Sequence, residues 1–260
     1  MLKSLNTAAT GMIAQQTNID VTANNMANVN TTGFRRSRAE FQDLIYQTIR
    51  TPGGQTADGA TLPTGIQVGQ GVRTVSASAI HSQGTLAQTE GALDLAIEGD
   101  GFFQIQRPNG ELAYTRAGNF HRDQDGRMVT VDGFAIEPSI TIPQDSTSIT
   151  ITADGTVSAT TGADLSAQEI GQIQLANFAN PQGLAALGRS LYVPTNASGE
   201  PMVGTPGEDG MGTVAQGMLE GSNVEVVNEM IDLIKSQRAY EINQRVIDSA
   251  DDMLRKLAQR

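Results

Sequence analysis

The chain has 260 residues, and its 17 lysine and arginine side chains stand against 28 aspartate and glutamate side chains, which leaves a net charge of −11. A phosphate backbone requires a basic surface, so this balance argues against a nucleic-acid-binding protein. The absence of cysteine excludes disulfides and thiolate metal sites, and two histidines, His81 and His121, are too few for a multi-histidine metal centre.

Neither a targeting sequence nor a membrane-spanning sequence is visible. The first 20 residues lack the unbroken apolar run of a cleaved secretory signal. No stretch of 18 apolar residues occurs, so we expect no membrane insertion. The chain is therefore expected to be cytosolic, or exported by a route that does not require a cleaved signal peptide.

The N-terminal segment is expected to form a helix over residues 2–29. Apolar and small residues recur there at alternating spacings of three and four, which is the heptad pattern of a coiled coil. The sequence Asn30 to Gly33 is a plausible end for this helix. Its apolar stripe includes Leu5, Met12, Ile19 and Met26.

Residues 47–72 are rich in glycine, threonine and proline and hold few residues that could anchor a core. A structureless loop of this length is unusual in a compact domain, so we interpret the segment as a functional loop or an extended arm.

The middle of the chain is expected to be antiparallel β structure. Short β-branched runs occur at 129–131, 135–136, 140–142 and 149–152. Asp-Gly or Asn-Gly pairs lie beside them at 100–101, 109–110, 125–126, 132–133 and 154–155. Such pairs favour two-residue hairpin turns, in which both central residues adopt positive φ.

A second long helix is expected from residue 222 to near the C-terminus, where glycine and proline are absent. Ser222 and Glu225 match a capping box, in which each side chain accepts a hydrogen bond from the other residue's backbone N–H. A 3/4 spacing follows, and a flanking row broadens the apolar stripe: Val227, Ile231, Ile234, Val246, Met253 and Leu257.

These elements predict an α+β fold, in which long N- and C-terminal helices form a coiled-coil domain around a central antiparallel β-rich domain. The expected division is a helical polymerisation domain (1–36 with 222–260), an extended strap (37–74) and a β-rich outer domain (75–221). Two such helices are marginal alone and gain stability from partners. We therefore expect them to become ordered on assembly, although a helical hairpin packed on the β domain of a monomer remains an alternative.

The candidates for catalysis are weak. Asp123 and Asp125 begin a possible calcium loop, but the residue at its twelfth position is apolar rather than glutamate. Glu98 and Asp100 are interpreted as a solvated strand face, and His81 as an exposed or satisfied surface histidine. No nucleophile elbow occurs. We therefore expect a protein that is not an enzyme and has no cofactor, catalytic residue or metal site.

Several motifs lie in a fixed order along the chain: A-N-N-M-A-N-V-N-T-T-G-F at 23–34, D-L-A-I-E-G-D-G-F-F at 94–103, Y-T-R-A-G-N-F at 114–120, G-S-N-V at 221–224 and Q-R-A-Y-E at 237–241. Together they resemble the motifs of the bacterial flagellar rod and hook proteins. The positions that carry the terminal part of the resemblance are Asn24, Asn25, Asn28, Gly33, Phe34, Ser222, Asn223, Val224, Gln237, Arg238 and Tyr240.

Within this family, the chain length and the segment 46–69 resemble the subunits of the distal rod. The resemblance implies a helical homopolymer, a rigid hollow shaft that transmits torque to the hook and houses the export channel. It implies a periplasmic location in the basal body, export by the flagellar type III apparatus, and contacts with proximal rod proteins, the hook protein and the surrounding ring proteins. An insertion that stiffens the rod would include Gln47, Arg50, Pro52, Leu62, Pro63 and Ile66.

Three other interpretations are kept open. A hook or proximal rod subunit belongs to the same family, although segment 47–70 argues against the hook. A secreted carbohydrate-binding module would need exposed aromatic residues, and aromatics are only 4% of this chain. A carboxylate-based hydrolase would need a cleft with two facing carboxylates.

Overall fold

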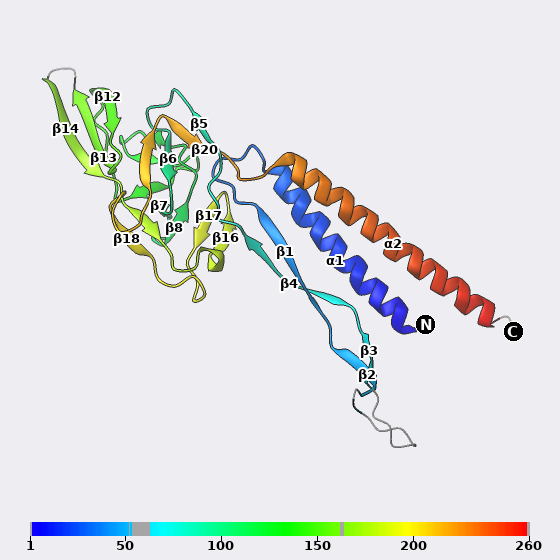
Figure 1. The fold of residues 1–260 in the computed structure, drawn as a ribbon. Coiled ribbons are helices and arrows are strands. Elements are labelled where there is room, and N and C mark those ends of the chain that lie inside the picture. The colour runs from blue at the N-terminus through cyan, green and yellow to red at the C-terminus, as the bar shows by residue number, and fades with distance from the viewer. Residues whose placement is uncertain (1, 52, 54–62, 162–163, 259–260) are drawn as a thin grey trace. The chain divides into compact units, whose positions relative to one another are not determined.

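The structure is a computed structural model, and it describes residues 2–51, 53, 63–161 and 164–258. It consists of two compact units, each built from separate stretches of the chain (Figure 1). Unit 1 contains Met1–Met26, Ser37–Ser78 and Glu225–Arg260, and unit 2 contains Ala27–Arg36 and Ala79–Val224. The fold is α+β, with helices at both ends of the chain and antiparallel β structure between them, as the sequence predicts.

Unit 1 holds both long helices, α1 (Leu2–Ala27) and α2 (Val226–Ala258), which lie side by side and run in opposite directions (Figure 1). Both lack proline, the strongest helix breaker. Arg255 and Lys256 lie in the last turn of α2, where their positive charges interact favourably with the negative end of the helix dipole.

The predicted capping box is wrong. The first helical hydrogen bond of α2 runs from the Glu229 N–H to the Glu225 carbonyl, 3.0 Å away, so the helix begins after Glu225. Ser222 lies outside the helix, and its Oγ accepts a bond from the Val224 N–H at 3.3 Å.

The segment between α1 and unit 2 forms an arm of paired strands in unit 1. Strands β1 (Ser37–Asp43) and β4 (Val72–Ala79) pair with each other, and β2 (Tyr46–Arg50) pairs antiparallel with β3 (Ile66–Gly69). A bond of 2.8 Å from the Leu44 N–H to the Gly71 carbonyl joins the two pairs. The described part of the arm is therefore a long hairpin rather than a loop.

Unit 2 is organised around β7 (Phe102–Gln106), which pairs antiparallel with β8, β11 and β15. The main sheet also contains these strands: β8 (Leu112–Thr115), β9 (His121–Arg122), β10 (Met128–Val129), β11 (Ala135–Glu137), β15 (Leu175–Asn177), β16 (Ala185–Gly188), β17 (Leu191–Val193) and β18 (Met202–Gly204).

Three smaller sheets complete unit 2. In the first, β13 (Thr156–Thr161) lies between β12 (Ser146–Ile151) and β14 (Asp164–Gln172) and pairs with both. The other two pair β6 (Leu95–Glu98) with β19 (Thr213–Gln216), and β5 (Leu86–Gln88) with β20 (Met218–Glu220). A short 3-10 turn, Pro181–Gly183, precedes β16. The core contains Leu95, Ile97, Phe103, Ile105, Phe120, Ile136, Val157 and Ile173, all fully buried or nearly so.

Four hairpin turns that contain an Asn-Gly or Asp-Gly pair share one geometry, which differs from the predicted one. In the turn 107–111 the Gly110 N–H bonds to the Arg107 carbonyl, and the Arg107 N–H bonds to the Glu111 carbonyl, both at 2.9 Å. The turns at 123–127, 130–134 and 152–156 repeat these bonds. In each, the glycine has positive φ but the preceding Asn or Asp does not, so these are three-residue loops with a glycine bulge.

One predicted strand is not formed. Ile140 and Ile142 are buried, but the segment 140–142 makes only an isolated bridge between Thr141 and Arg127. Burial of both isoleucines explains the β-branched pattern without an extended ladder.

Candidate assembly surfaces

The two helices of unit 1 meet along a polar seam. The Asn25 Nδ2 donates to Glu229 Oε2 at 3.1 Å, and the Asn18 Nδ2 donates to Ser236 Oγ at 2.7 Å. A further seven residues along, a Cβ placed on Gly11 would lie 3.0 Å from the Asn243 Nδ2. The contacts therefore repeat every seven residues on both helices.

The buried residues of unit 1 are small or polar. Its buried hydrophobic side chains, within the described part of the chain, are alanines: Ala8, Ala14, Ala39 and Ala250. Its buried polar residues are Thr22, Asn25, Glu229 and Ser236. Because larger apolar side chains supply most of the hydrophobic stabilisation of a core, this unit buries very little of it.

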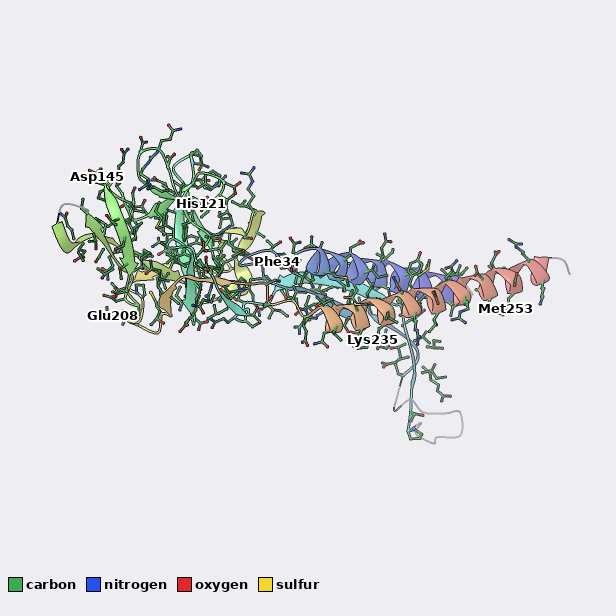
Figure 2. The ribbon with its side chains drawn as sticks, turned by 90° about the horizontal axis from the view of Figure 1, so that it is seen from above. Phe34, His121, Asp145, Glu208, Lys235 and Met253 are labelled. Atoms are coloured by element: carbon green, nitrogen blue, oxygen red, sulfur yellow. The ribbon has the colours of Figure 1, made fainter. Side chains whose placement is uncertain are left out.

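Many large apolar residues of α2 are exposed instead, among them Met253, which is labelled in Figure 2. The exposed fractions are 63% for Val227, 44% for Ile231 and 46% for Ile234. Val246 and Met253 are also exposed, and the side chain of Leu257 lies outside the described residues. On α1, Leu5, Met12, Ile19 and Met26 are half-buried. α2 thus presents an apolar face that its own unit does not cover.

The arm is attached to α1 at three points. The Asn25 side chain donates to the Ser37 carbonyl at 2.8 Å and accepts from the Ser37 N–H at 2.9 Å. Farther along, Thr10 Oγ1 accepts from the Val72 N–H at 3.4 Å. Lys3 donates to Gln47 near the start of β2.

The hairpin of β2 and β3 leaves apolar side chains in solvent. Ile49 and Ile66 are 64% and 46% exposed, and Ile45, just before β2, is 83% exposed. Among the predicted insertion residues, Gln47, Arg50 and Pro63 are exposed as well, while Pro52 and Leu62 lie outside the described residues. The arm is therefore a second uncovered apolar surface.

A buried ionic cluster in unit 2 joins three distant parts of the sequence. Glu220 Oε1 accepts from Arg35 Nη2 and from the Gly84 N–H, both at 2.8 Å, and Glu220 Oε2 accepts from Arg116 Nη1 at 3.4 Å. All three charged side chains are at least 96% buried. The Glu220 carbonyl also accepts from the Gly33 N–H at 2.8 Å.

The motif residues on either side of this cluster hold the ends of unit 2 together. Asn223 Oδ1 accepts from the Arg36 N–H at 2.7 Å, and its Nδ2 donates to the Ile80 carbonyl at 2.8 Å. A Cβ on Gly33, whose φ is +67°, would lie only 2.5 Å from the Ala117 nitrogen, which explains why glycine stands there.

The other predicted motif residues are spread over both units. Ser222 and Val224 are buried in unit 2, where Phe34 and Asn28 are half-buried. In unit 1, Asn24, Gln237, Arg238 and Tyr240 are exposed.

His81 is not the surface histidine that the sequence suggests. Its ring packs edge-on against Phe102 and Tyr192, with centroids 5.7 and 5.6 Å away. Burial, with the positive charges of Arg35 and Arg116, lowers the pKa of His81 to about 4. Burial likewise lowers the pKa of Arg116 to about 10, which still leaves the guanidinium charged.

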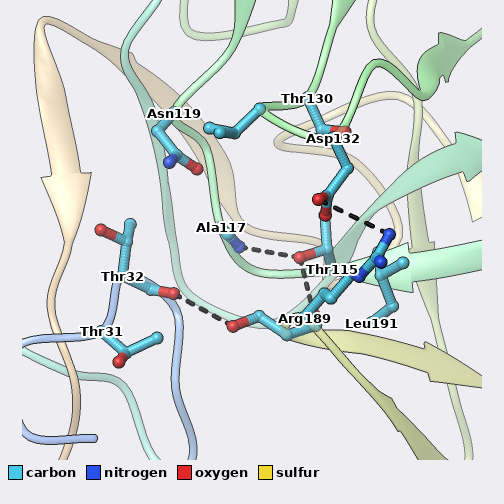
Figure 3. Close-up of a pocket in the computed structure, with 11 residues that line it drawn as sticks. Thr31, Thr32, Thr115, Ala117, Asn119, Thr130, Asp132, Arg189 and Leu191 are labelled. Carbon is cyan, nitrogen blue, oxygen red and sulfur yellow. Dashed lines mark hydrogen bonds and ion pairs between the residues drawn. The ribbon is translucent and has the colours of Figure 1, made fainter.

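A pocket of about 230 Å³ in unit 2 is lined by hydroxyl and amide groups (Figure 3). Thr115 Oγ1 donates to the Ser190 carbonyl at 2.8 Å, and the Ser190 Oγ donates to the Thr32 carbonyl at 3.4 Å. Asp132 and Arg189 are the lining residues that carry charge, and they pair with each other at 3.6 Å. The pocket has no arrangement of a nucleophile with a base.

The part of the chain that the structure describes offers neither a cluster of metal ligands nor a helix that could span a bilayer. No group of three or more His, Asp or Glu side chains there is arranged to hold a metal ion. Neither described helix is long and apolar enough to span a bilayer.

Sequence reasoning missed the polar seam and the Arg35–Glu220–Arg116 cluster. The seam residues of α1 recur every seven residues, one position before Met12, Ile19 and Met26 of the apolar stripe, but their polarity argues against a helix interface. The cluster left a weaker signal: Arg35 and Glu220 directly adjoin the motifs at 23–34 and 221–224.

Comparison with known proteins identifies the family. Three segments match family models: residues 5–35 match the flagella basal body rod protein, residues 96–159 the flagellar hook protein FlgE/F/G D1 domain, and residues 215–260 the flagellar basal body rod FlgEFG protein C-terminal region. The chain is 51% identical to the flagellar basal-body rod protein FlgG of Caulobacter vibrioides, with 99% of each chain covered. The chain belongs to the FlgG family of flagellar basal-body rod proteins.

Other FlgG relatives match over similar lengths. The identity is 49% to the FlgG of Buchnera aphidicola subsp. Acyrthosiphon pisum, with 100% of each chain covered, and 50% to that of Agrobacterium fabrum, with 97% of each covered. The chain is therefore a structural protein of the basal-body rod, of the distal-rod type, and not an enzyme. Rod family membership also implies that it polymerises with other rod and hook components.

Proposed function

We propose that this chain polymerises helically into the distal rod, a rigid hollow shaft that transmits torque from the motor to the hook and surrounds the export channel. Residues 1–36 with 222–260 serve as the polymerisation domain, 37–74 as a strap between subunits, and 75–221 as the outer wall. The observation that carries this proposal is the uncovered apolar face of α2, in a chain similar to FlgG over its whole length.

The proposed helix contacts form a coiled coil within and between subunits. Leu5, Met12, Ile19 and Met26 of α1 meet the α2 row Val227, Ile231, Ile234, Val246, Met253 and Leu257 on neighbouring copies. The α2 residues that are described expose between 43% and 63% of their surface in one subunit, so neighbours would remove substantial apolar area from water.

The proposed location is the periplasmic part of the basal body, reached through the type III export apparatus without cleavage of a signal peptide. The proximal rod proteins and the hook protein are the expected axial neighbours, and ring proteins surround the shaft. The proposed role of the arm, including Gln47, Arg50, Pro52, Leu62, Pro63 and Ile66, is to stiffen the polymer.

The test places an aspartate on the apolar face. We expect Met12→Asp and Ile234→Asp each to abolish distal rods in electron micrographs of extracted basal bodies, because a charge would be buried without a partner at every contact. Hydrogen exchange should show β7 and β8 as protected as before. The matched control is Gln244→Asp, which adds the same charge at an exposed polar position of α2.

A strain that lacks only this chain separates the assignments within the family. Rods that stop short of the distal part would support the proposal. A complete rod that lacks only its hook would show that the chain is a hook subunit. Normal rods in the Met12→Asp and Ile234→Asp strains would refute the helix contacts.

A further inference from the structure

The contacts between α1 and α2 define one register. Asn25 meets Glu229, Asn18 meets Ser236, and Gly11 meets Asn243, so each step of seven residues forward on α2 is a step of seven back on α1. Continued by one more step, this register would place Ser4 opposite Ala250, which is 1% exposed. The seam would then span nearly the whole described length of α1.

The seam matches residue sizes as well as hydrogen bonds. The small Gly11 lies against the larger Asn243, and the larger Asn18 lies against the small Ser236. A slip of seven residues would place Asn18 opposite Asn243 and Gly11 opposite Ala250. One layer would then be overfilled and the other underfilled, and both errors destabilise packed helices.

Asn25 fixes the end of the seam. Its amide binds both backbone groups of Ser37 on the arm, and the same Nδ2 donates to the Glu229 carboxylate. Glu229 is 1% exposed, so a slipped helix would carry a buried charge away from this donor. Losing a hydrogen-bond partner of a buried charged group is costly, which penalises the wrong register.

We propose that Asn18, Asn25, Ser236 and Glu229 are register-determining residues, which select one alignment of α2 against α1 and so fix which apolar side chains the subunit presents to its neighbours. This inference rests on the proposed function, since the face presented is the polymer contact. The seam itself adds little stability. A polar residue in a helix interface is known to specify alignment at a cost in stability.

The test uses the absence of cysteine from the chain, because two introduced cysteines form one unambiguous disulfide. The reporter of the native register is Gly11→Cys with Asn243→Cys, since a Cβ on Gly11 lies 3.3 Å from the Asn243 Cγ. The reporters of a slip by one heptad are Gly11→Cys with Ala250→Cys, and Ser4→Cys with Asn243→Cys. Disulfide yields are measured after mild oxidation of rods and of the soluble chain.

With Asn18, Ser236 and Glu229 unchanged, we expect the native cysteine pair to form about tenfold more disulfide than either slipped pair. This ratio corresponds to a free-energy difference of about 1.4 kcal/mol between the two registers. Asn18→Leu, Ser236→Leu and Glu229→Leu together should bring this ratio close to one, because leucines pack in several alignments. A chain that carries Asn18→Ser with Ser236→Asn in place of the leucines should return the disulfide ratio to about tenfold. The matched control is Gln16→Leu, Gln244→Leu and Ser249→Leu, which adds leucines only at exposed positions.

If the variant with leucine at positions 18, 236 and 229 keeps the tenfold disulfide ratio, the inference is overturned. Should that variant fail to fold, Asn18→Ala with Ser236→Ala removes the hydrogen bond without adding volume, and an unchanged ratio there would overturn it equally. Failure of the proposed function looks different: a chain with a natural seam would form no rods while its soluble form still showed the native ratio.

Discussion

Glu220 accepts hydrogen bonds from four groups of unit 2. Its carboxylate accepts from Arg35, Arg116 and the Gly84 N–H, and its carbonyl accepts from the Gly33 N–H. A buried ion pair of this kind contributes little net stability compared with an apolar core, but removing one partner leaves the others buried and charged. Here two guanidinium groups depend on one carboxylate, so this position should tolerate substitution poorly.

We expect Glu220→Gln to lower the free energy of unfolding of unit 2 by about 3–5 kcal/mol, because Arg35 and Arg116 would keep their charges without the carboxylate. The measurement is urea unfolding followed by hydrogen exchange in β7 and β8. Glu111→Gln is the control: it breaks the exposed pair with Arg107 and should cost about 1 kcal/mol or less. Equal effects of the two substitutions would show that the buried cluster contributes no more to the free energy of unfolding than an exposed ion pair does.

His81 should make unit 2 sensitive to mild acid. Its pKa is lowered from 6.5 to about 4 by burial and by the positive charges of Arg35 and Arg116. Both arginines also pair with Glu220, the acidic residue of the neighbouring cluster. The unfolded chain therefore binds a proton at His81 at a higher pH than the folded chain does. The stability contributed by neutral His81 is complete above pH 6.5 and is lost as the pH falls towards 4.

We expect His81→Phe, which keeps an aromatic ring without a titrating group, to flatten the dependence of unfolding free energy on pH between 6.5 and 4. The difference in slope from the natural chain should reach at most about 1.4 kcal/mol per pH unit. His121→Phe, at an exposed position of β9, should leave the slope unchanged. A slope that survives the loss of His81 would assign the effect to other groups.

At this scale the sequence indicated which segments matter but not why. The motifs at 23–34 and 221–224 pointed to Gly33 and Asn223, and both make specific contacts in unit 2. The partners Arg35 and Glu220 are 185 residues apart, so only the folded chain brings them together. The ring partners of His81, Phe102 and Tyr192, also lie outside its local sequence, which is why a polar local sequence suggested a surface residue.

At the scale of elements, periodicity predicted both helices to within a few residues, because their 3/4 patterns are long and uninterrupted. It did not identify the face that each helix turns to the other. The apolar stripe containing Leu5, Met12 and Ile19 is adjacent to the polar seam and not identical with it. The usual rule that the apolar face packs inside the subunit fails for much of α2, and the proposed contacts with other copies would account for this.

The arm can be shortened without disturbing its base. Leu44 and Gly71 are joined by a hydrogen bond, so deletion of 47–70 leaves β1 and β4 to be closed by a short turn. We expect this variant to keep unit 2 folded and to form polymers that are curved or more flexible, because the exposed apolar residues of β2 and β3 are gone. The measurement is the persistence length of polymers in electron micrographs.

The matched control replaces 47–70 with a Gly/Ser linker of equal length, which keeps the spacing but not the contacts and should soften the polymer as the deletion does. Straight polymers of unchanged stiffness from both variants would contradict a stiffening role for the arm.

At the scale of the whole molecule, the two units bury different kinds of residue. Unit 2 contains the large apolar side chains that are buried in the described part of the chain, whereas unit 1 buries alanines and polar groups and leaves its large apolar residues half-buried or exposed. We therefore expect unit 2 to be stable by itself and unit 1 to gain much of its stability from partners. The sequence led us to expect residues 27–36 with the helices, whereas Ala27–Arg36 lie in unit 2.

Unit 2 should fold without the helices and the arm. The Ile80 N–H bonds to the Arg36 carbonyl at 2.8 Å, so the two chain segments of unit 2 are neighbours where the arm departs. We expect a chain of residues 27–36 joined through a short Gly-Ser-Gly turn to residues 79–224 to unfold cooperatively in urea and to stay monomeric. Its β7 and β8 amides should be protected as in the full chain, and Glu220→Gln should lower its urea midpoint. An excised chain without protected amides would mean that unit 2 requires unit 1, and the assignment of folding stability to unit 2 would then fail.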